Sequence, residues 1–218
     1  MKIDIITLFP EMFEGPFSES IIKRAQEKDL VKINIHNLRE YGIDERKTVD
    51  GRPYSGGPGM LLRVDVVDNA LKDLQNKKHK NKKTVLLDAT GEPFKQKMAK
   101  GFSKLDQLIL ICGHYEGVDH RIHEHLVDGV ISIGDYVLTG GEIPAMVVTD
   151  SVARLIPGVL GKDESSVDES HSVPGYLEYP QYTRPEKYNK WEVPSVLLSG
   201  NHKEIIDWKK KNQPSPAK

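Results

Sequence analysis

The sequence is almost free of cysteine, because Cys112 is the single one among 218 residues. One thiol cannot form an internal disulfide, and it cannot supply the several sulfur ligands of a cysteine-based zinc site. Cys112 ends an uninterrupted apolar run, so we expect it to be a small buried side chain. The shortage of cysteine excludes a disulfide-stapled module and favours a reducing compartment.

The sequence also lacks a long hydrophobic run and an excess of charge of one sign. The first apolar stretch contains Asp4, so it fits neither a signal peptide nor a membrane span, and no other stretch is long enough. We therefore expect a cytoplasmic protein with no membrane partner. Lys and Arg number 31 against 32 Asp and Glu, a net charge of −1, which excludes a uniformly basic nucleic-acid binder. Any site for a polyanion must be a local patch.

Short strand patterns alternate with helical patterns over the first 160 residues. Apolar or period-2 runs predict strands at residues 3–9, 31–35, 84–87, 108–112 and 130–133. Helical spacing predicts helices at residues 10–26, 64–74, 95–103, 118–126 and 143–156. The last of these is apolar almost all round, which predicts a buried helix. Alternating strands and helices are typical of an α/β fold with a mostly parallel sheet.

The composition changes after Pro157-Gly158, which predicts two domains joined by a linker. We expect a domain at residues 1–160, a polar linker at 161–175 and a small helical domain at 176–218. The last of these has eight basic against five acidic residues, interleaved with tyrosines and tryptophans, whereas residues 113–169 have three basic against eleven acidic. Interleaved aromatics and cations suit RNA, although a packed subdomain has the same composition.

Three glycine-bearing segments follow predicted strands, at residues 88–91, 113–117 and 134–141. In an open α/β sheet, ligands bind outside the carboxyl ends of the strands, so the three segments predict one pocket. Glycine lets backbone amides approach a ligand closely, which suits a nucleotide-like group, although each segment alone could be an ordinary turn. None matches a dinucleotide-binding fingerprint or a P-loop. The glycine-rich stretch at 39–59 is predicted to be a long loop.

Charged residues in two other places are candidates for chemistry. Asp150 and Arg154 are four apart on an otherwise apolar helix, which is either an ordinary ion pair or a guanidinium aimed at a carbonyl or an oxyanion. Asp168 and Glu169 lie in the polar linker, where a solvated acidic pair is the alternative to a catalytic one. The histidines near Cys112 do not share one helix face, so they do not predict a metal site; they are His114, His120, His123 and His125.

Together these segments resemble the bacterial tRNA (guanine-N1)-methyltransferases that modify guanosine-37, which are SPOUT-class enzymes. The resemblance covers nearly the whole chain and is specific, because many ordered blocks match at family spacing. The blocks are residues 6–13 (ITLFPEMF), 48–50 (TVD), 53–54 (PY), 56–60 (GGPGM), 112–119 (CGHYEGVD), 132–142 (SIGDYVLTGGE), 182–185 (YTRP) and 196–202 (VLLSGNH).

The resemblance implies a deep trefoil knot in a mostly parallel α/β sheet, and S-adenosyl-L-methionine as the methyl donor. Family members are homodimers whose active site lies at the subunit interface. The residues implied to bind the donor are Leu86, Leu87, Gly91, Gly113, Glu116, Ile133, Gly134, Asp135, Tyr136, Val137, Leu138, Gly140, Gly141 and Pro144. The residues implied to bind tRNA are Asp50, Tyr54, Gly59, Arg184, Ser199, Asn201 and His202. A Mg²⁺ requirement is also implied, but the sequence shows no dedicated ligand cluster for it.

The family's chemistry needs a base and a cation at the guanine edge. N1 of guanine carries a proton at neutral pH, and negative charge moves to O6 when that proton leaves, so a carboxylate base and an arginine at O6 answer both needs. Arg154 matches the family's O6-stabilising arginine, and Glu169 fills the slot where the family most often has aspartate. We expect Glu169 to be the base, with Asp168 as the alternative.

Two departures leave a second function open. Glutamate at 169 is one methylene longer than the usual aspartate, and the C-terminal domain is expected to be shortened, because the chain ends at Lys218. These features make a non-catalytic RNA-binding dimer with the same fold the alternative to a methyltransferase.

Overall fold

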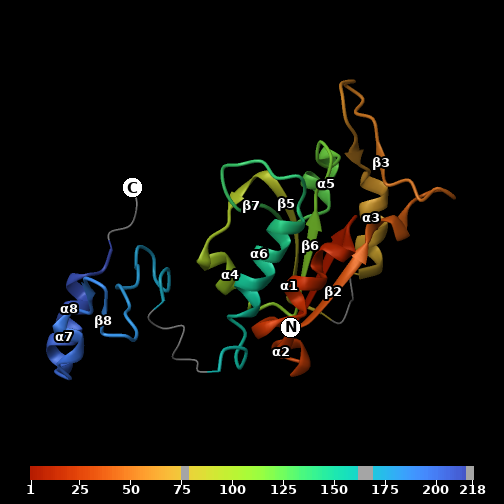
Figure 1. The fold of residues 1–218 in the computed structure, drawn as a ribbon. Coiled ribbons are helices and arrows are strands. Elements are labelled where there is room, and N and C mark those ends of the chain that lie inside the picture. The colour runs from red at the N-terminus through yellow and green to blue at the C-terminus, as the bar shows by residue number, and fades with distance from the viewer. Residues whose placement is uncertain (75–78, 162–168, 215–218) are drawn as a thin grey trace. The chain divides into compact units, whose positions relative to one another are not determined.

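The computed structural model describes residues 1–74, 79–161 and 169–214, and it divides into two units, Met1–Gly161 and residues 162–218. The first unit contains a five-stranded sheet (Figure 1). Its strands are β1 (Lys2–Thr7), β2 (Lys32–Asn37), β5 (Lys82–Pro93), β6 (Gln107–Cys112) and β7 (Gly129–Ser132). They lie in the order β2-β1-β6-β5-β7, and every neighbouring pair is parallel. The α/β class with a mostly parallel sheet is therefore confirmed.

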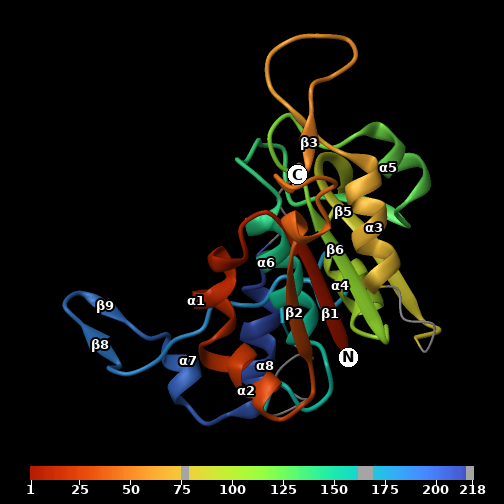
Figure 2. The same ribbon diagram turned by 90° about the vertical axis from the view of Figure 1, so that its right-hand side faces the viewer.

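Helices cover both faces of this sheet, which makes three layers (Figure 2). One face packs against η1 (Pro10–Phe13), α1 (Glu14–Phe17), α2 (Ser20–Glu27), α4 (Gln96–Phe102) and α6 (Glu142–Ala153). The other packs against η2 (Leu38–Tyr41), α3 (Val64–Leu74) and α5 (His120–His125). A sheet covered on both faces requires apolar residues on both sides of its central strands.

The central strand β6 shows this requirement directly. Leu108 and Leu110 point into one hydrophobic core, whereas Ile109 and Ile111 point into the other, and all four are fully buried. Side chains alternate across a strand, so an uninterrupted apolar run serves two cores at once. Cys112 ends the strand and is buried as predicted.

The structure corrects two predicted boundaries near the N-terminus. The helix predicted at 10–26 is broken into η1, α1 and α2, with a break at Ser18–Glu19 and a left-handed backbone at Ser20 (φ 53°). Gly15 and Pro16 lie just before the break, and both are poor helix formers. The loop predicted at 39–59 contains η2 and the first strand of a hairpin, β3 (Asp50–Gly51) paired with β4 (Leu61–Leu62).

The second unit is small. It contains a two-stranded hairpin, β8 (Lys187–Tyr188) with β9 (Trp191–Glu192), and two helices, α7 (Ser195–Leu198) and α8 (His202–Lys211). Aromatic rings supply some of its packing: Tyr182 lies edge-on to Trp208, and Lys209 stands 4.4 Å above the Tyr179 ring. Trp191 on the hairpin is 71% exposed. Its aromatics therefore divide between internal packing and an exposed surface.

A buried carboxylate ties the middle of the sheet together. Asp4 on β1 is fully buried and accepts hydrogen bonds from Asn34 (3.0 Å), His36 (2.8 Å) and Gln107 (2.7 Å), while the Lys2 ammonium lies 3.0 Å away. Burial by itself raises the pKa of Asp4, but the hydrogen bonds outweigh burial and lower it to about 2. The charged form therefore links β1 to both of its neighbours, β2 and β6.

We predict that Asp4→Asn lowers the free energy of unfolding by about 3 kcal/mol at pH 7, because it leaves donors and cations facing a neutral amide. The folded-state pKa of Asp4 lies below its ordinary value of 3.8, so its charge stabilises the fold above that value and less as the pH falls towards 2. The difference between wild type and variant in urea unfolding should therefore narrow by about 2 kcal/mol between pH 5 and pH 2.

Asp68→Asn is the matched control, because Asp68 forms an exposed i,i+4 pair with Lys72 on α3. Loss of an exposed pair should change the free energy of unfolding by less than about 0.5 kcal/mol. Equal effects of the two substitutions would contradict the role given to Asp4.

Candidate active site

A cavity of about 270 Å³ lies where β6 and β7 end, beside residues 87–89 of β5, and we call it the strand-end pocket. Its volume is close to the lower end of the range for small-molecule sites, about 300 to 1,000 Å³. All three glycine-bearing segments contribute to its wall. The lining residues are Leu87, Asp88, Ala89, Gly113, His114, Tyr115, Glu116, Gly117, Ile131, Ser132, Ile133, Gly134, Tyr136, Val137, Leu138, Thr139, Gly140, Gly141 and Pro144.

The first wall segment, residues 88–91, is an interruption inside β5 rather than a loop after it. β5 pairs with β7 through Leu87, opposite Ile131, and resumes at Glu92, opposite the same residue. The Asp88 carboxylate accepts hydrogen bonds from the amide and the hydroxyl of Thr90, both at 2.8 Å, which closes the bulge. This corrects the strand predicted at 84–87, which runs to Pro93. Bulges of this kind re-aim side chains next to functional sites.

The second wall segment, residues 113–117, is held by the hairpin that carries β3 and β4. The Glu116 amide donates to the Met60 carbonyl (3.1 Å), and the Leu62 amide donates to the Gly117 carbonyl (3.1 Å). A side chain at Gly59 would collide with Glu116, so the hairpin needs glycine there. Tyr115 adopts a left-handed backbone (φ 61°), which is strained for a bulky residue. The hairpin and this segment thus form one rigid edge of the pocket.

The third wall segment, residues 133–141, crosses back from β7 to the end of β6. The Gly141 amide donates to the Gly113 carbonyl (2.8 Å), and His114 pairs with Gly140 in an isolated antiparallel bridge. A Cβ atom at Gly141 would lie 2.6 Å from the Cα of Cys112, which only glycine avoids. The second and third segments therefore close on each other through their backbones.

The floor beneath this closure holds a buried carboxylate. Glu142, the first residue of α6, is 2% exposed, and its Oε1 accepts a hydrogen bond from the Thr7 hydroxyl at 2.8 Å. Its Oε2 lies 3.9 Å from Nδ1 of His114. Burial raises the pKa of the neighbouring Cys112 thiol well above its ordinary value, and the negative Glu142 raises it further. Cys112 is therefore a protonated, unreactive side chain.

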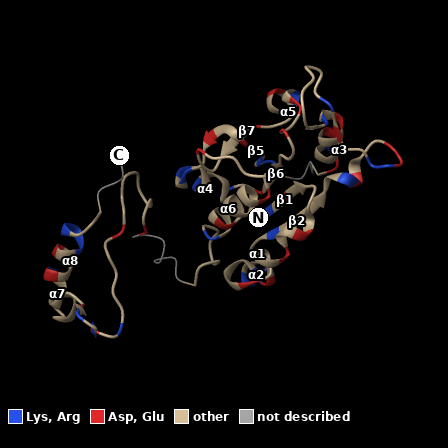
Figure 3. Cartoon of the chain, turned by 45° about the horizontal axis from the view of Figure 1, so that its top comes forward, with Lys and Arg blue, Asp and Glu red and all other residues tan. Residues whose placement is uncertain are grey.

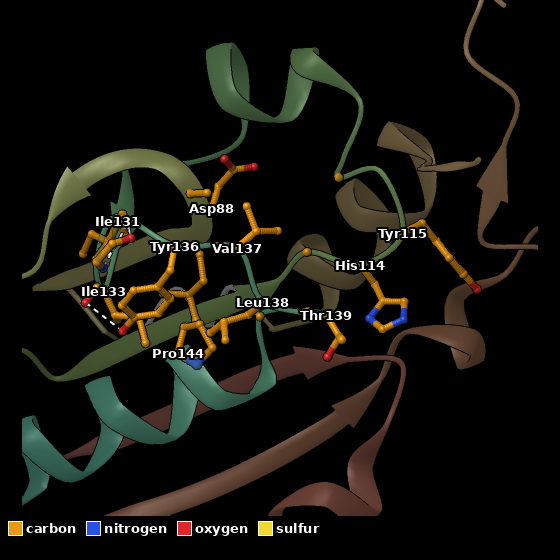
Figure 4. A pocket seen from close by; sticks show the side chains of 18 of the residues that line it. Asp88, His114, Tyr115, Ile131, Ile133, Tyr136, Val137, Leu138, Thr139 and Pro144 are labelled. Carbon is orange, nitrogen blue, oxygen red and sulfur yellow. Dashed lines mark hydrogen bonds between the residues drawn. The ribbon is translucent and has the colours of Figure 1, made fainter. Parts of the chain in front are cut away.

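The lining has one apolar end and one polar end (Figure 4). Ile131, Ile133, Tyr136 and Pro144 lie towards one end, and His114 and Tyr115 lie towards the other. The Tyr136 hydroxyl donates to the Ile133 carbonyl (3.2 Å), which folds its ring along the third segment. An apolar slot for a base, with polar groups beyond it, fits an adenosine carrying a polar substituent.

The structure gathers most of the donor-binding residues expected from the sequence into this one lining. Three of the expected residues do not line it: Leu86 is fully buried within the sheet, Gly91 packs against the backbone of β7, and Asp135 is exposed. Eight lining residues were not among the expected donor contacts, although six of them fall within the three segments predicted to form the pocket. These six are Asp88, Ala89, His114, Tyr115, Gly117 and Thr139, and the other two are Ile131 and Ser132 on β7.

Arg154 lies at the other end of α6 from the pocket floor. It is the C-cap of the helix and partly buried, and twelve residues of helix place it about 18 Å from Glu142. It does not line the strand-end pocket of its own chain. Helical spacing puts Arg154 on the same face as Ile143, Val147 and Asp150. We call these four residues the α6 face.

The α6 face corrects the prediction that this helix is buried all round. Ile143 is 46% exposed and Val147 is 41% exposed, whereas Ala145, Val148 and Val152 on the opposite side are fully buried. The neighbouring η1 packs against α6. Met12 in η1 and Phe9 just before it are also exposed. α6 has apolar residues on two sides, but the described residues of one chain bury only one of these sides.

The two candidate bases differ in what the structure describes. Glu169 is partly buried, and its carbonyl accepts a hydrogen bond from the Ser172 amide at 3.0 Å. Asp168 lies outside the described residues. Glu169 belongs to the second unit and Arg154 to the first, and the structure describes each unit by itself.

The residues expected to bind tRNA fall into two groups. Asp50, Tyr54 and Gly59 lie on the β3–β4 hairpin, where Tyr54 is fully exposed. Ser199, Asn201 and His202 lie at the α7–α8 junction, where Asn201 caps α8 by accepting the Glu204 amide. Arg184 is exposed in the segment before β8. Acidic and basic residues are interspersed on α3, α5 and α8 (Figure 3), so neither unit carries charge of only one sign on these helices.

Two kinds of feature are absent from the described residues: a membrane-spanning helix and a cluster of metal ligands. No described helix is both long enough and apolar enough to span a bilayer. No three His, Cys, Asp or Glu side chains in the described part of the chain gather in a way that could hold a metal ion.

Comparison with known proteins identifies the family of the chain. A family model described as tRNA (Guanine-1)-methyltransferase TrmD matches residues 1–217. The tRNA (guanine-N(1)-)-methyltransferase of Bacillus pumilus is 54% identical over 211 residues, which are 97% of this chain and 86% of the relative. Relatives of the same name from Dehalococcoides mccartyi and Bacillus subtilis are each 53% identical over 97% of this chain and cover 85% and 86% of their own length. The chain belongs to the tRNA (guanine-1)-methyltransferase family.

Proposed function

We propose that this protein transfers a methyl group from S-adenosyl-L-methionine to N1 of guanosine-37 in tRNA. The observation that carries the proposal is the strand-end pocket, which is built from the glycine-bearing blocks of a methyltransferase family. Its apolar slot suits the adenine of the donor, and its polar end suits the amino-acid part. When bound, the donor supplies an electrophilic methyl group on a sulfonium.

The chain's own residues supply the rest of the chemistry. Glu169 is the proposed base that takes the proton from N1 of guanine, because the lone pair is unavailable until that proton leaves. Arg154 is the proposed donor to O6, where negative charge accumulates as N1 is deprotonated. Each contribution typically lowers a barrier by a few kcal/mol. Mg²⁺, if required, would arrive with the tRNA.

The position of Arg154 supports a homodimer with a composite site. Arg154 stands about 18 Å along α6 from the pocket floor, so it cannot serve the pocket of its own chain while α6 stays intact. It shares the α6 face with two exposed apolar residues, Ile143 and Val147. Exposed apolar patches beside a site are typical of subunit interfaces. A partner's pocket placed against the α6 face would bring Arg154 to the methyl donor.

We infer the trefoil knot from the path of the third wall segment. β7 lies at the sheet edge beyond β5, whereas residues 140–141 lie at the end of β6. The segment that connects β7 to these residues therefore crosses β5. β5 itself continues past this point to Pro93 and into α4. A knot arises in a sheet when one segment crosses a strand and is enclosed by the chain that continues from that strand. Such knots are rare exceptions to the unknotted topology of most proteins.

The tRNA is proposed to contact exposed elements rather than the pocket walls alone. The β3–β4 hairpin offers Tyr54 for stacking, Arg184 and the α7–α8 junction offer polar groups, and the last turn of α8, at the other end of that helix, offers cations. With a net charge of −1, binding should rest on such local contacts and depend strongly on salt.

The proposed function predicts methylation that depends on one base. The protein, labelled S-adenosyl-L-methionine and Mg²⁺ should transfer label to a tRNA with guanine at position 37, because only guanine presents N1 beside O6. A matched tRNA with adenine at that position is the control. Label in neither tRNA, with folded protein, would leave the non-catalytic RNA-binding dimer as the surviving function.

If Glu169 is the base, its substitution should reduce turnover without changing the binding of the methyl donor. Glu169→Gln should lower kcat by at least about a hundredfold, because it removes the proton acceptor, and should leave the Kd for S-adenosyl-L-methionine unchanged in calorimetry. Asp168→Asn is the paired variant and should keep near-normal turnover. The opposite pattern would move the role of base to Asp168.

The composite site predicts complementation between inactive variants. Arg154→Ala and Leu138→Glu should each abolish turnover, the first at the α6 face and the second in the pocket. Mixing the two under subunit exchange should restore about a quarter of wild-type activity, because half of the dimers are mixed and each has one intact site.

The control is a mixture of wild type with a double variant that carries Arg154→Ala and Leu138→Glu in the same chain. Mixed dimers have no intact site if each site is shared between subunits, and one intact site if it is not. Equal mixtures should therefore keep about a quarter of wild-type activity for a shared site and about half for separate sites. No recovery in the first mixture and half in the second would refute the composite site.

A further inference from the structure

A buried nitrogen without a hydrogen-bond partner lies at the polar end of the strand-end pocket. Nδ1 of His114 is closed off from solvent and makes no hydrogen bond to the described residues. The rings of Phe9 and Tyr115 pack against the imidazole, with centroids 4.8 Å and 4.9 Å away. The Glu142 carboxylate faces Nδ1 at 3.9 Å. The imidazole is therefore held in place with its inner nitrogen pointing towards a buried negative charge.

The chemistry of that contact decides which nitrogen is left for a ligand. An ionised carboxylate can only accept hydrogen bonds, so Nδ1 must carry the proton that faces Glu142. The gap of 3.9 Å exceeds a normal hydrogen bond by less than about 1 Å, which a small tilt of the ring closes. His114 lines the pocket and its side chain is 21% exposed although Nδ1 is buried, so the pocket is reached by other atoms of the ring, and Nε2 is the second ring nitrogen available to a ligand.

The charges of the lining indicate what that group is. Among the described residues that line the pocket, Asp88 and Glu116 are acidic, and neither Lys nor Arg is present. His114 is thus the one lining side chain able to carry a positive charge at neutral pH. With Nδ1 turned towards Glu142, a proton on Nε2 would point to a ligand, and a charged imidazole that donates from Nε2 suits an anionic partner.

We propose that His114 binds an anionic group of the substrate through Nε2, and that Glu142 is the positioning residue that orients the imidazole. This inference rests on the proposed function and extends it to a residue outside the proposed base and O6 contact. Two sources offer such an anion: the carboxylate of the methyl donor and a phosphate of the tRNA. Thr7 completes the arrangement by donating to the other oxygen of Glu142 at 2.8 Å.

The test compares two adenosine ligands by calorimetry. S-adenosylhomocysteine carries the amino-acid carboxylate, whereas 5′-methylthioadenosine lacks the amino-acid part and retains the adenosine. His114→Gln keeps a hydrogen-bond donor but removes the charge, and we expect it to weaken S-adenosylhomocysteine about tenfold while 5′-methylthioadenosine binds as before. That result assigns the anion to the donor. His114→Arg, which restores a cation, should recover most of the lost affinity.

The second arm measures tRNA. If His114→Gln leaves both adenosine ligands unchanged but weakens tRNA binding about tenfold, with a shallower dependence on salt concentration, the anion is a phosphate. Glu142→Gln can still accept from Thr7 through its amide oxygen, so it should reproduce the loss seen with His114→Gln. The double variant should bind no more weakly than His114→Gln alone, because both residues act through one contact.

His120→Gln is the matched control, because His120 lies on α5, is 78% exposed and does not line the pocket. Equal weakening of both adenosine ligands by His114→Gln would overturn the proposal, since it would show a general loss of the pocket. So would unchanged binding of all three ligands. If the wild-type protein binds neither adenosine ligand, the proposed function fails and this inference fails with it.

Discussion

The buried carboxylate of Glu142 stands where the ends of three strands meet, and the rest of the site depends on it. It accepts a hydrogen bond from Thr7 at the end of β1, faces His114 just after β6, and follows the glycine pair that returns from β7. A carboxylate in the first turn of α6 is also favoured by the helix dipole. Gly141 allows this meeting, because any side chain there would collide with Cys112. One buried charge and one glycine thus set the floor of the pocket.

Two buried carboxylates in the first unit differ in how fully they are satisfied. Asp4 is surrounded by side chains from β1, β2 and β6, and the hydrogen bonds lower its pKa, as expected of a charge that serves the fold. Around Glu142, the ring nitrogen of His114 is buried without a hydrogen bond to the described residues. Native proteins rarely leave such groups unpaired unless a ligand, a water or a function accounts for them. An orphaned atom is not peculiar to the surroundings of Glu142, because Gln107 beside Asp4 also has a buried oxygen without a hydrogen bond to the described residues. The role proposed for Glu142 follows instead from its position behind His114, which lines the pocket.

How much the sequence predicts depends on whether the neighbours of a segment belong to the same chain. The unbroken apolar run of β6 and the spacing of α3 predict buried elements, because both pack inside one unit. The glycines at the strand ends likewise predict the pocket. The bulge at 88–91 is not predicted, since a side-chain bond from Asp88 creates it. Nor is the exposed α6 face, because an apolar helix looks the same whether its second side meets its own core or a partner. The pairing of His114 with Glu142 joins residues 28 apart, which no local pattern reveals.

The charges of the strand-end pocket explain how a protein of net charge −1 can serve a polyanionic substrate. Asp88 and Glu116 in the lining repel phosphate but suit the positive sulfonium of the proposed donor, whereas His114 suits an anion. Two cations near the hairpin are already occupied, because Arg63 and Arg121 each form a two-bond pair with an aspartate. In the proposed function, exposed aromatics and the lysines in the last turn of α8 therefore supply further contacts for the tRNA outside the pocket lining. The acidic part of the lining then remains to suit the positively charged donor.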